Sequence, residues 1–267
     1  MNLFPINEVQ LMTAFFVLVR VSAIIALLPL FGDRTVPPTI KVLFSVAMSF
    51  VVFPTLWQSG LRFSDVKSQS TGLLVGAVVS ELFVGLLLGF FARWIFDAVR
   101  AAGYFMGTQM GFSMGSVLDP TTETQTIALA EFQYGLAALL FLAMDGHHVY
   151  VNSIMDSFRL IPLGELPVLS KGDTMIRTLI DLTEKVLLLS VHLAAPVLIV
   201  MLLVNLAFGL VSRAVPQINM LVISFAANIL VGLMIFAVSL PGFHALVGTQ
   251  FEEYSQQLRS FMTLLGN

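Results

Sequence analysis

Residues 186–211 read VLLLSVHLAAPVLIVMLLVNLAFGLV, and residues 218–240 read INMLVISFAANILVGLMIFAVSL. Neither stretch contains Asp, Glu, Lys or Arg, and each is longer than the roughly 20 apolar residues that a helix needs to cross a bilayer. The connection between them, residues 212–217, is short enough to require two antiparallel helices. These stretches therefore predict a membrane-type helical hairpin.

The rest of the chain extends this interpretation. Of its 267 residues, 57% are hydrophobic and only 11% are charged, a composition outside the range of soluble domains. Further apolar runs occupy residues 11–31, 40–57, 71–96 and 127–144. We therefore expect an all-α, polytopic membrane protein in contact with lipid. Lys and Arg show no bias among the first connections, so two interpretations stay open: a weakly encoded orientation, or helices that pack inside a larger protein assembly.

Residues 101–118 carry no charge and contain an internal repeat. Glycine and methionine each recur at every fourth residue, so that G-x-x-M occurs three times in succession. Four glycines lower helix stability by roughly 3–4 kcal/mol relative to alanine, so we expect marginal order rather than a robust helix. The repeat consists of Gly103, Gly107, Gly111 and Gly115 with Met106, Met110 and Met114.

Two interpretations of this repeat are open. Glycines at this spacing form packing faces between membrane helices, with methionines filling the gaps. Alternatively, the segment is a deformable seal, in which unbranched thioethers and aromatic rings exclude water and ions while the glycines let the backbone bend. The sealing side chains would be Phe105, Met106, Met110, Phe112 and Met114.

Polar stretches and breaks divide the chain. Residues 145–185 form the longest polar stretch, which two prolines and a glycine break midway. After Pro241-Gly242, residues 243–267 carry aromatic and leucine residues at helical spacing beside charged ones. We expect this tail to be an amphipathic helix that docks on a partner or on the membrane surface.

Three charged residues lie inside apolar runs, namely Arg20, Glu81 and Glu131. Because an unpaired charge is costly in such a run, each needs a partner. One interpretation is an ion- or proton-coupled membrane transporter that uses Glu81 or Glu131 as a relay. The favoured interpretation is buried charge pairing between helices or subunits, with Arg20 against a carboxylate, because isolated acids without a repeat specify no substrate.

The sequence lacks the signatures of enzymes and metal sites. His147 and His148 are adjacent, and neighbouring side chains on a helix diverge by about 100°, so we expect them not to share a metal ion. His192 and His244 lack ligand clusters. No Gly-rich phosphate loop is present, and a net charge of -3 gives no nucleic-acid footprint. We therefore expect no catalytic, cofactor or metal site and no nucleic-acid partner.

Three blocks, in this order, resemble one known family. They read MGFSMGSVLDP at residues 110–120, LFLAMDGH at 140–147 followed by SFRLIPLG at 157–164, and SRAVPQIN at 212–219. Together they are similar to the FliR family of flagellar export proteins, the R-type (SctT-like) subunits of type III secretion export gates. The resemblance covers essentially the whole chain, and the SFRLIPLG block favours a flagellar over an injectisome member.

This resemblance implies an organisation and a function that composition does not show. It implies a P-like helical portion over residues 1–185 with a Gly/Met-rich plug loop at 103–118, a Q-like hairpin over 186–240, and the tail 241–267. It implies a structural and gating subunit of the flagellar export channel in the bacterial inner membrane, at the flagellar basal body. The implied partners are the P- and Q-type subunits FliP and FliQ, then FlhB and FlhA, and unfolded flagellar export substrates.

Overall fold

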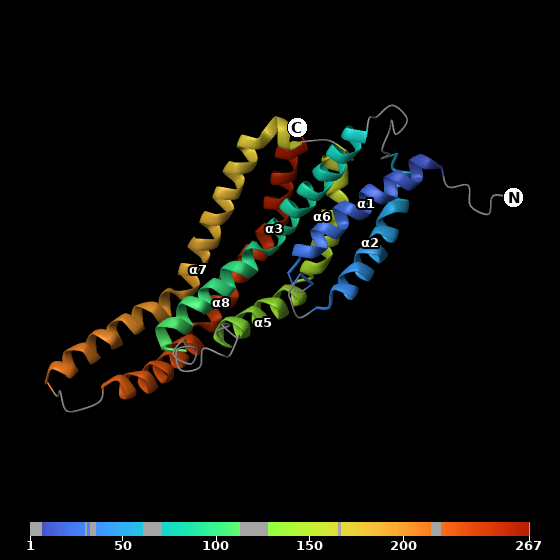
Figure 1. The fold of residues 1–267 in the computed structure, drawn as a ribbon. Helices are drawn as coiled ribbons and strands as arrows, with labels where there is room; N and C mark the ends of the chain where they lie inside the picture. The colour runs from blue at the N-terminus through green and yellow to red at the C-terminus, as the bar shows by residue number, and fades with distance from the viewer. Residues whose placement is uncertain are drawn as a thin grey trace. The chain divides into compact units, whose positions relative to one another are not determined.

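The computed structural model describes residues 7–29, 31–32, 36–60, 71–112, 128–164, 167–214 and 220–266. Regular structure in these ranges is entirely α-helical, which confirms the expected fold class (Figure 1). The helices are α1 (Glu8–Leu27), α2 (Pro38–Gln58), α3 (Thr71–Met110), α5 (Ala128–Ala143), α6 (Gly146–Leu160), α7 (Pro167–Ala214) and α8 (Met220–Gly266).

The described helices include five that are long and apolar enough to cross a membrane. A sixth crossing is reached if α5 and α6, which are bent by 73° relative to each other, form one span. This confirms the expectation of a polytopic membrane protein.

The chain folds into two compact units, and α3, α7 and α8 each contribute to both. Unit 1 consists of Met1–Trp94, Asp145–Leu182 and Glu253–Asn267, and unit 2 of Ile95–Met144 and Thr183–Glu252. In unit 1, α1 packs along α2 (Figure 1). In unit 2, the rings of Phe96, Phe141 and Phe251 lie within 5.6 Å of one another, centroid to centroid, and bring α3, α5 and α8 together.

Three helices are much longer than a single crossing requires. Helices α3, α7 and α8 contain 40, 48 and 47 residues, whereas about 20 residues cross the hydrocarbon core. The boundaries expected at 185/186 and 240/241 therefore fall inside α7 and α8. The polar residues that open α7 suit a solvated helix, since Arg177 donates to Asp173 one turn earlier at 3.1 Å.

The expected break at Pro241-Gly242 is wrong, because α8 continues through Pro241 to Gly266. A proline inside a helix removes one backbone hydrogen bond, and membrane-type helices tolerate that loss where neighbouring groups satisfy the freed carbonyl. The break after α6 is real. Helix α6 ends at Leu160, and α7 starts at Pro167, where proline suits the first helical position.

The tail does not present its apolar face to a partner or to the membrane surface, and that expectation is wrong. Phe251, Tyr254, Leu258 and Phe261 are at most 8% exposed. Within unit 1, the ring of Phe91 stacks on Phe261 at 5.2 Å and contacts Tyr254 at 6.0 Å. The apolar stripe of the tail is therefore part of the core of its own chain, while its acidic face is exposed.

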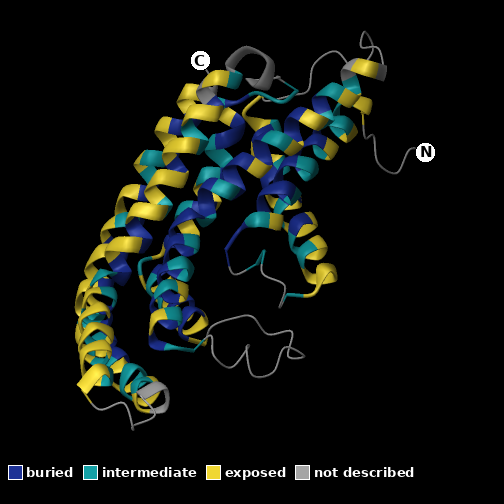
Figure 2. Ribbon diagram, turned by 60° about the vertical axis from the view of Figure 1, so that its left-hand side comes forward, coloured by how far each residue is buried: buried dark blue, intermediate teal, exposed yellow. Residues whose placement is uncertain are grey.

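The hairpin formed by the apolar parts of α7 and α8 is largely exposed. Figure 2 shows exposed residues along much of α7, whereas buried residues follow α3. One polar contact crosses the hairpin, in which Asn228 Nδ2 donates to Asn205 Oδ1 at 3.0 Å. The turn, residues 215–219, lies outside the described residues.

Candidate functional site

A buried ion pair joins α1 to α3 in unit 1. Arg20 Nε donates to Glu81 Oε2 at 2.5 Å, and a terminal nitrogen of Arg20 donates to Glu81 Oε1 at 3.0 Å. Both residues are fully buried. This two-pronged geometry matches the planar guanidinium to the planar carboxylate. Of the carboxylates that could accompany Arg20, the structure therefore places Glu81 beside it.

The same ion pair also binds backbone groups in the segment that joins the end of α6 to the start of α7. The remaining terminal nitrogen of Arg20 donates to the carbonyls of Ser157 and Ile161 at 3.0 and 2.9 Å. Glu81 Oε1 also accepts the backbone N–H of Gly164 at 2.9 Å. A cation is thus placed at the C-terminal end of α6, where the helix dipole favours positive charge. The pair is a structural clamp that ties two helices to the end of a third.

Two glycines that sequence reasoning missed allow this approach of α3 to α1. A methyl group placed on Gly85 would lie 2.6 Å from Cβ of Ala23, and one on Gly89 would lie 2.8 Å from Cβ of Leu27. Real contacts are never so short, so any larger residue would separate the helices. The signal was present in the sequence, since glycines four residues apart in an apolar run are typical of close helix crossings.

Glu131 does not belong to a buried charge cluster, and that expectation is corrected. Its side chain is 45% exposed in this chain and lies 3.5 Å from Arg100. The guanidinium of Arg100 lies over the ring of Tyr134, 4.1 Å from the centroid. Glu131 begins the helical face of α5 that points outward, so pairing with a neighbour on α3 satisfies it without burial.

The first half of the Gly/Met repeat is helical, contrary to the expectation of a loop from residue 103. Gly103, Met106, Gly107 and Met110 lie in α3 and form one buried face at helical spacing. The low helix propensity of glycine is overcome by packing. A methyl group on Gly103 would lie 2.5 Å from the Cα atom of Ala130, so α3 and α5 touch backbone to backbone there.

The other side of this helix end contacts α8. Met110 is fully buried, and its side chain lies across Gly232. A methyl group on Gly232 would lie 2.5 Å from Cγ, 2.8 Å from Cε and 2.9 Å from Sδ of Met110. Met110 therefore fills a hollow that exists only because residue 232 has no side chain.

Helix α3 ends at Met110, and the next residue turns the chain. Gly111 has φ of 92°, a conformation that glycine adopts without strain, and its N–H donates to the Thr108 carbonyl at 3.1 Å. A methyl group on Gly111 would meet the Phe225 ring at 3.1 Å. Phe105 and Phe112 are half-buried, whereas Met114 and Gly115 lie outside the described residues.

These positions change the assignment of the sealing residues. Met106 and Met110 are fully buried inside the chain, where they cannot line a channel formed with other subunits. Of the residues named from the sequence, Phe105 and Phe112 keep part of their side chains accessible. The packing-face interpretation thus describes the buried face of residues 103–110, and the sealing interpretation stays a hypothesis for Phe105 and for residues 111–118.

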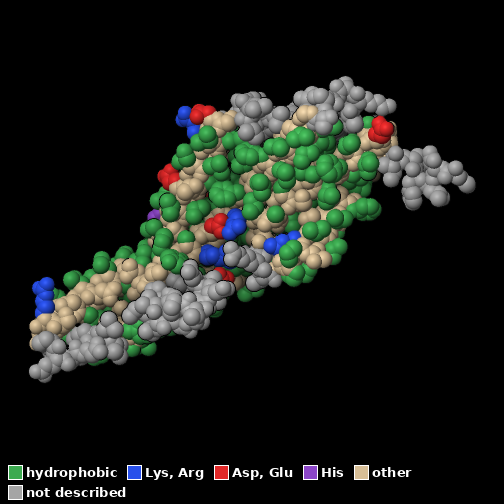
Figure 3. Space-filling model, viewed as in Figure 1, with side chains coloured by type: hydrophobic (Ala, Val, Ile, Leu, Met, Phe, Trp, Pro, Cys, Tyr) green, Lys and Arg blue, Asp and Glu red, His purple; other side chains and the backbone are tan. Residues whose placement is uncertain are grey.

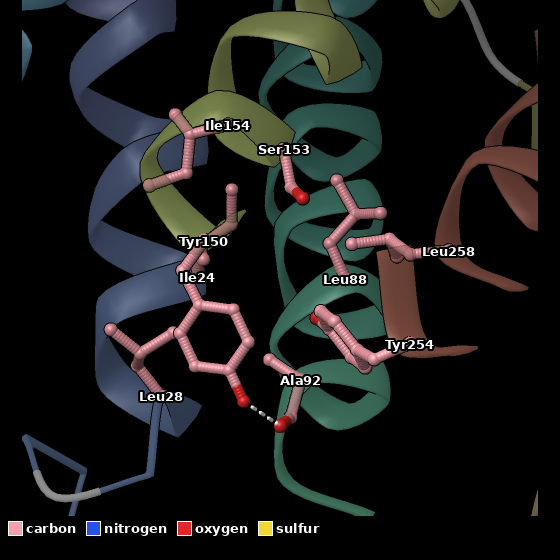
Figure 4. Close-up of a pocket in the computed structure, with 9 residues that line it drawn as sticks. All are labelled: Ile24, Leu28, Leu88, Ala92, Tyr150, Ser153, Ile154, Tyr254 and Leu258. Atoms are coloured by element: carbon pink, nitrogen blue, oxygen red, sulfur yellow. Dashed lines mark hydrogen bonds between the residues drawn. The ribbon is translucent and has the colours of Figure 1, made fainter. Parts of the chain in front are cut away.

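A small cavity in unit 1 lies between α1, α3, α6 and α8 (Figure 4). Its volume of about 20 Å³ has room for about one water molecule. Tyr150, whose hydroxyl donates to the Ala92 carbonyl, projects into it with Ser153 and Tyr254 among apolar side chains. This cavity is too small for an organic substrate.

The two adjacent histidines do not diverge, and that expectation was wrong. The rings of His147 and His148 lie 4.1 Å apart, centroid to centroid. Together with Asp145, they bring three potential ligand atoms within 4.8 Å of one another. Asp145, with φ of 55°, precedes α6, and its Oδ1 lies 3.5 Å from His148 Nδ1. All three side chains are exposed, so no packing holds them in a coordinating geometry.

The described surface is largely apolar. Hydrophobic side chains cover much of the face shown in Figure 3, and charged ones are scattered. On α2, Val42, Leu43, Phe50 and Val51 are between 62% and 80% exposed. On α7, Leu202, Leu203 and Leu206 are between 59% and 70% exposed. Such patches on a helical protein mark contact with lipid or with partner subunits. Apolar helices, an internally satisfied ion pair and an apolar exterior define a multi-pass α-helical membrane protein.

Comparison with known proteins narrows this class. Residues 11–254 match the family described as bacterial export proteins, family 1, and the chain belongs to this family. It is 33% identical to the flagellar biosynthetic protein FliR of Escherichia coli K12 over 85% of this chain and 84% of that protein. It is 30% identical to the FliR protein of Bacillus subtilis 168 over 97% of this chain and 98% of that protein. These similarities identify a membrane-embedded component of a flagellar export apparatus.

Proposed function

We propose that the chain is a structural and gating subunit of the flagellar type III protein export channel. It acts in the bacterial inner membrane, within the flagellar basal body. The observation that supports this most strongly is the family match over residues 11–254. The structure adds an apolar exterior. A structural rather than enzymatic role fits these features.

Partner subunits would cover the apolar faces of α2, α7 and α8. The proposed partners are the P- and Q-type subunits FliP and FliQ, with FlhB and FlhA as further gate components and unfolded flagellar proteins as the exported substrates. Apolar helices from such subunits would match the side chains exposed on this chain. The P-like portion (residues 1–185), the Q-like hairpin (186–240) and the tail (241–267) remain the proposed organisation by homology.

Residues 103–118, here called the closing segment, are proposed to close the channel. The helical half anchors the segment, and Phe105, Phe112 and Met114 are the proposed sealing side chains. An ion seal needs side chains that fill an irregular gap without polar groups that would hydrate a leak, and phenylalanine and methionine meet this requirement.

The transporter alternative finds no support in the contacts of the two acids. Glu81 accepts hydrogen bonds from Arg20 and from the Gly164 N–H in a fully buried site. Glu131 lies on the other unit, half-exposed and beside Arg100. A relay requires acids that exchange protons along a path, whereas these two have separate local partners.

Co-expression tests the assembly proposal. We expect the chain produced alone to be recovered in low yield and as aggregates, because its apolar faces lack partners. Co-expression with the P- and Q-type subunits should raise the monodisperse yield severalfold. Equal yield and monodispersity with and without these subunits would contradict the proposal.

Ion conductance tests the closing segment. Deletion of residues 112–117 should raise the conductance of the assembled complex in planar bilayers while its yield is unchanged. Deletion of six residues in the connection between α2 and α3, residues 62–67, is the matched control. An intact complex that stays closed after the first deletion would contradict this role.

A further inference from the structure

The end of α3 is held on two sides by contacts that each depend on a glycine. On one side, Gly103 touches the backbone of α5 at Ala130. On the other, the Met110 side chain lies over Gly232 of α8, with three of its atoms within 2.9 Å of where a methyl group would be. Both the methionine and the glycine positions of this helix end are buried. All these residues belong to unit 2.

The residue that follows these contacts, Gly111, has a backbone conformation that allows the chain to turn. Gly111 leaves the helix with φ of 92°, and the Phe225 ring lies against it. Met110, which precedes Gly111, is fully buried, whereas Phe112, which follows it, is only half-buried. Rotation about the backbone of Gly111 would therefore change the course of the chain beyond it without moving Met110.

We infer that Gly232 is a positioning residue of the channel: it receives the Met110 side chain and so fixes the end of α3, which sets where the chain continues after Gly111. Met110 is then an anchor that stays in place when the channel opens. This inference rests on the proposed gating function of the closing segment. It assigns a role in closure to α8, a helix that does not contain the Gly/Met repeat.

The contact can be tested by removing side-chain volume at Met110 and adding the same volume at Gly232. Gly232→Val adds the same number of heavy atoms that Met110→Ala removes, so the double variant nearly conserves the volume of the contact. We expect Gly232→Val to raise conductance per complex by about tenfold, because overpacking displaces the end of α3. The double variant should return to within about twofold of the unmodified complex. Gly242→Val is the matched control, since a methyl group there would meet nothing within 4 Å.

Complex yield separates positioning from simple misfolding. A merely structural glycine would lower yield in Gly232→Val and leave the conductance of the surviving complexes unchanged. If Gly232→Val does not assemble, Gly232→Ala provides a smaller displacement, and a rise in conductance that Met110→Ala suppresses is again expected. An unchanged conductance in every assembled Gly232 variant would overturn the inference, and so would a leak that Met110→Ala fails to suppress.

A disulfide tests whether the anchor stays in place. The methyl position on Gly232 lies 2.5 Å from Met110 Cγ, and Cγ is about 1.5 Å from Cβ, so the two Cβ positions lie within about 4 Å, as a disulfide requires. The chain has no cysteine, so Met110→Cys/Gly232→Cys forms the only possible pair within it. We expect complete oxidation with export unaffected, relative to each single cysteine variant. Failure to form the bond, or export that stops on oxidation and resumes on reduction, would overturn the fixed anchor.

The deletion of residues 112–117, measured in the same bilayers, separates this inference from the function on which it rests. A leak from the deletion, with closed Gly232→Val complexes, contradicts the positioning role alone. A deletion that stays closed contradicts the closing segment, and disulfide formation between Met110→Cys and Gly232→Cys still decides whether Met110 stays fixed against Gly232.

Discussion

Helix α3 makes two tight contacts whose chemistry differs. In unit 1, it approaches α1 through Gly85 and Gly89, and the crossing carries the ion pair of Glu81 with Arg20. In unit 2, it approaches α5 and α8 through Gly103 and Met110, and the ion pair between α3 and α5, Arg100 with Glu131, is partly exposed. Both contacts depend on glycine, but in the first the ion pair is fully buried.

The difference indicates how each contact responds to displacement. A two-pronged ion pair with further backbone partners has one geometry, and losing it leaves buried charge behind. A methionine has several rotatable bonds and no polar atom to leave unsatisfied. The unit 1 contact therefore suits a fixed clamp, and the unit 2 contact suits an anchor that tolerates small adjustments next to the turn at Gly111.

Truncation after Gly242 should have the largest effect, because it removes partners of α3 in both regions. Phe251, Tyr254, Leu258 and Phe261 are all buried, and each contributes about 1.5–3 kcal/mol when buried. Their combined loss is comparable to the whole stability of a domain, about 5–15 kcal/mol. We expect almost no folded protein by size-exclusion chromatography. Glu252→Gln/Glu253→Gln, on the exposed face, is the control, and recovery of the truncated chain at full level would refute the internal role of the tail.

Removal of one partner of the buried ion pair should have the second largest effect on stability. Arg20→Ala or Glu81→Ala should each destabilise the chain by about 3–5 kcal/mol, because the other charge stays buried without its partner. Arg20→Met/Glu81→Leu should recover a large part of that loss, since no charge remains. Thermal unfolding in detergent measures this. If the double variant were less stable than both single variants, the pair would be needed for more than mutual neutralisation.

Single methyl groups compare the two crossings directly. Gly85→Ala and Gly103→Ala should each destabilise by about 1–3 kcal/mol through overpacking. The added atom would lie 2.7 Å from the Arg20 carbonyl oxygen in the first case and 2.5 Å from Cα of Ala130 in the second. Gly135→Ala on α5 meets nothing within 4 Å and should stabilise by about 0.5–1 kcal/mol. If all three variants had the same melting temperature, the helices would separate to admit the added methyl groups at little cost in stability.

Loss of an exposed ion pair should have the smallest effect on stability. Arg259 donates to Asp156 at 2.8 and 3.1 Å and joins α8 to α6, but the Arg259 side chain is 69% exposed. Arg259→Ala should therefore cost less than about 1 kcal/mol, and the effect should vanish at high salt. A loss as large as that of Arg20→Ala, persisting in salt, would show that this pair is buried in the assembled protein.

Much of the local structure could be predicted from composition and spacing. The apolar runs predicted helices, and their lengths predicted a multi-pass membrane protein, because burial of apolar side chains and satisfaction of backbone hydrogen bonds leave few alternatives. The predictions that depended on breaks were less accurate. Pro241 does not end α8, and Gly103 does not end α3, because packing compensates for unfavourable local propensity.

The sequence by itself determined that the chain is helical, apolar outside and in need of partners for Arg20 and Glu81. The tertiary structure alone decided that these two meet across 61 residues, that Met110 lies over Gly232 and that the tail of α8 belongs to the core. The physical reason is that periodicity and burial act within a helix and can be read locally. Pairing between distant helices depends on where their backbones can approach, and the glycines that permit this belong to a different helix from the side chains they receive.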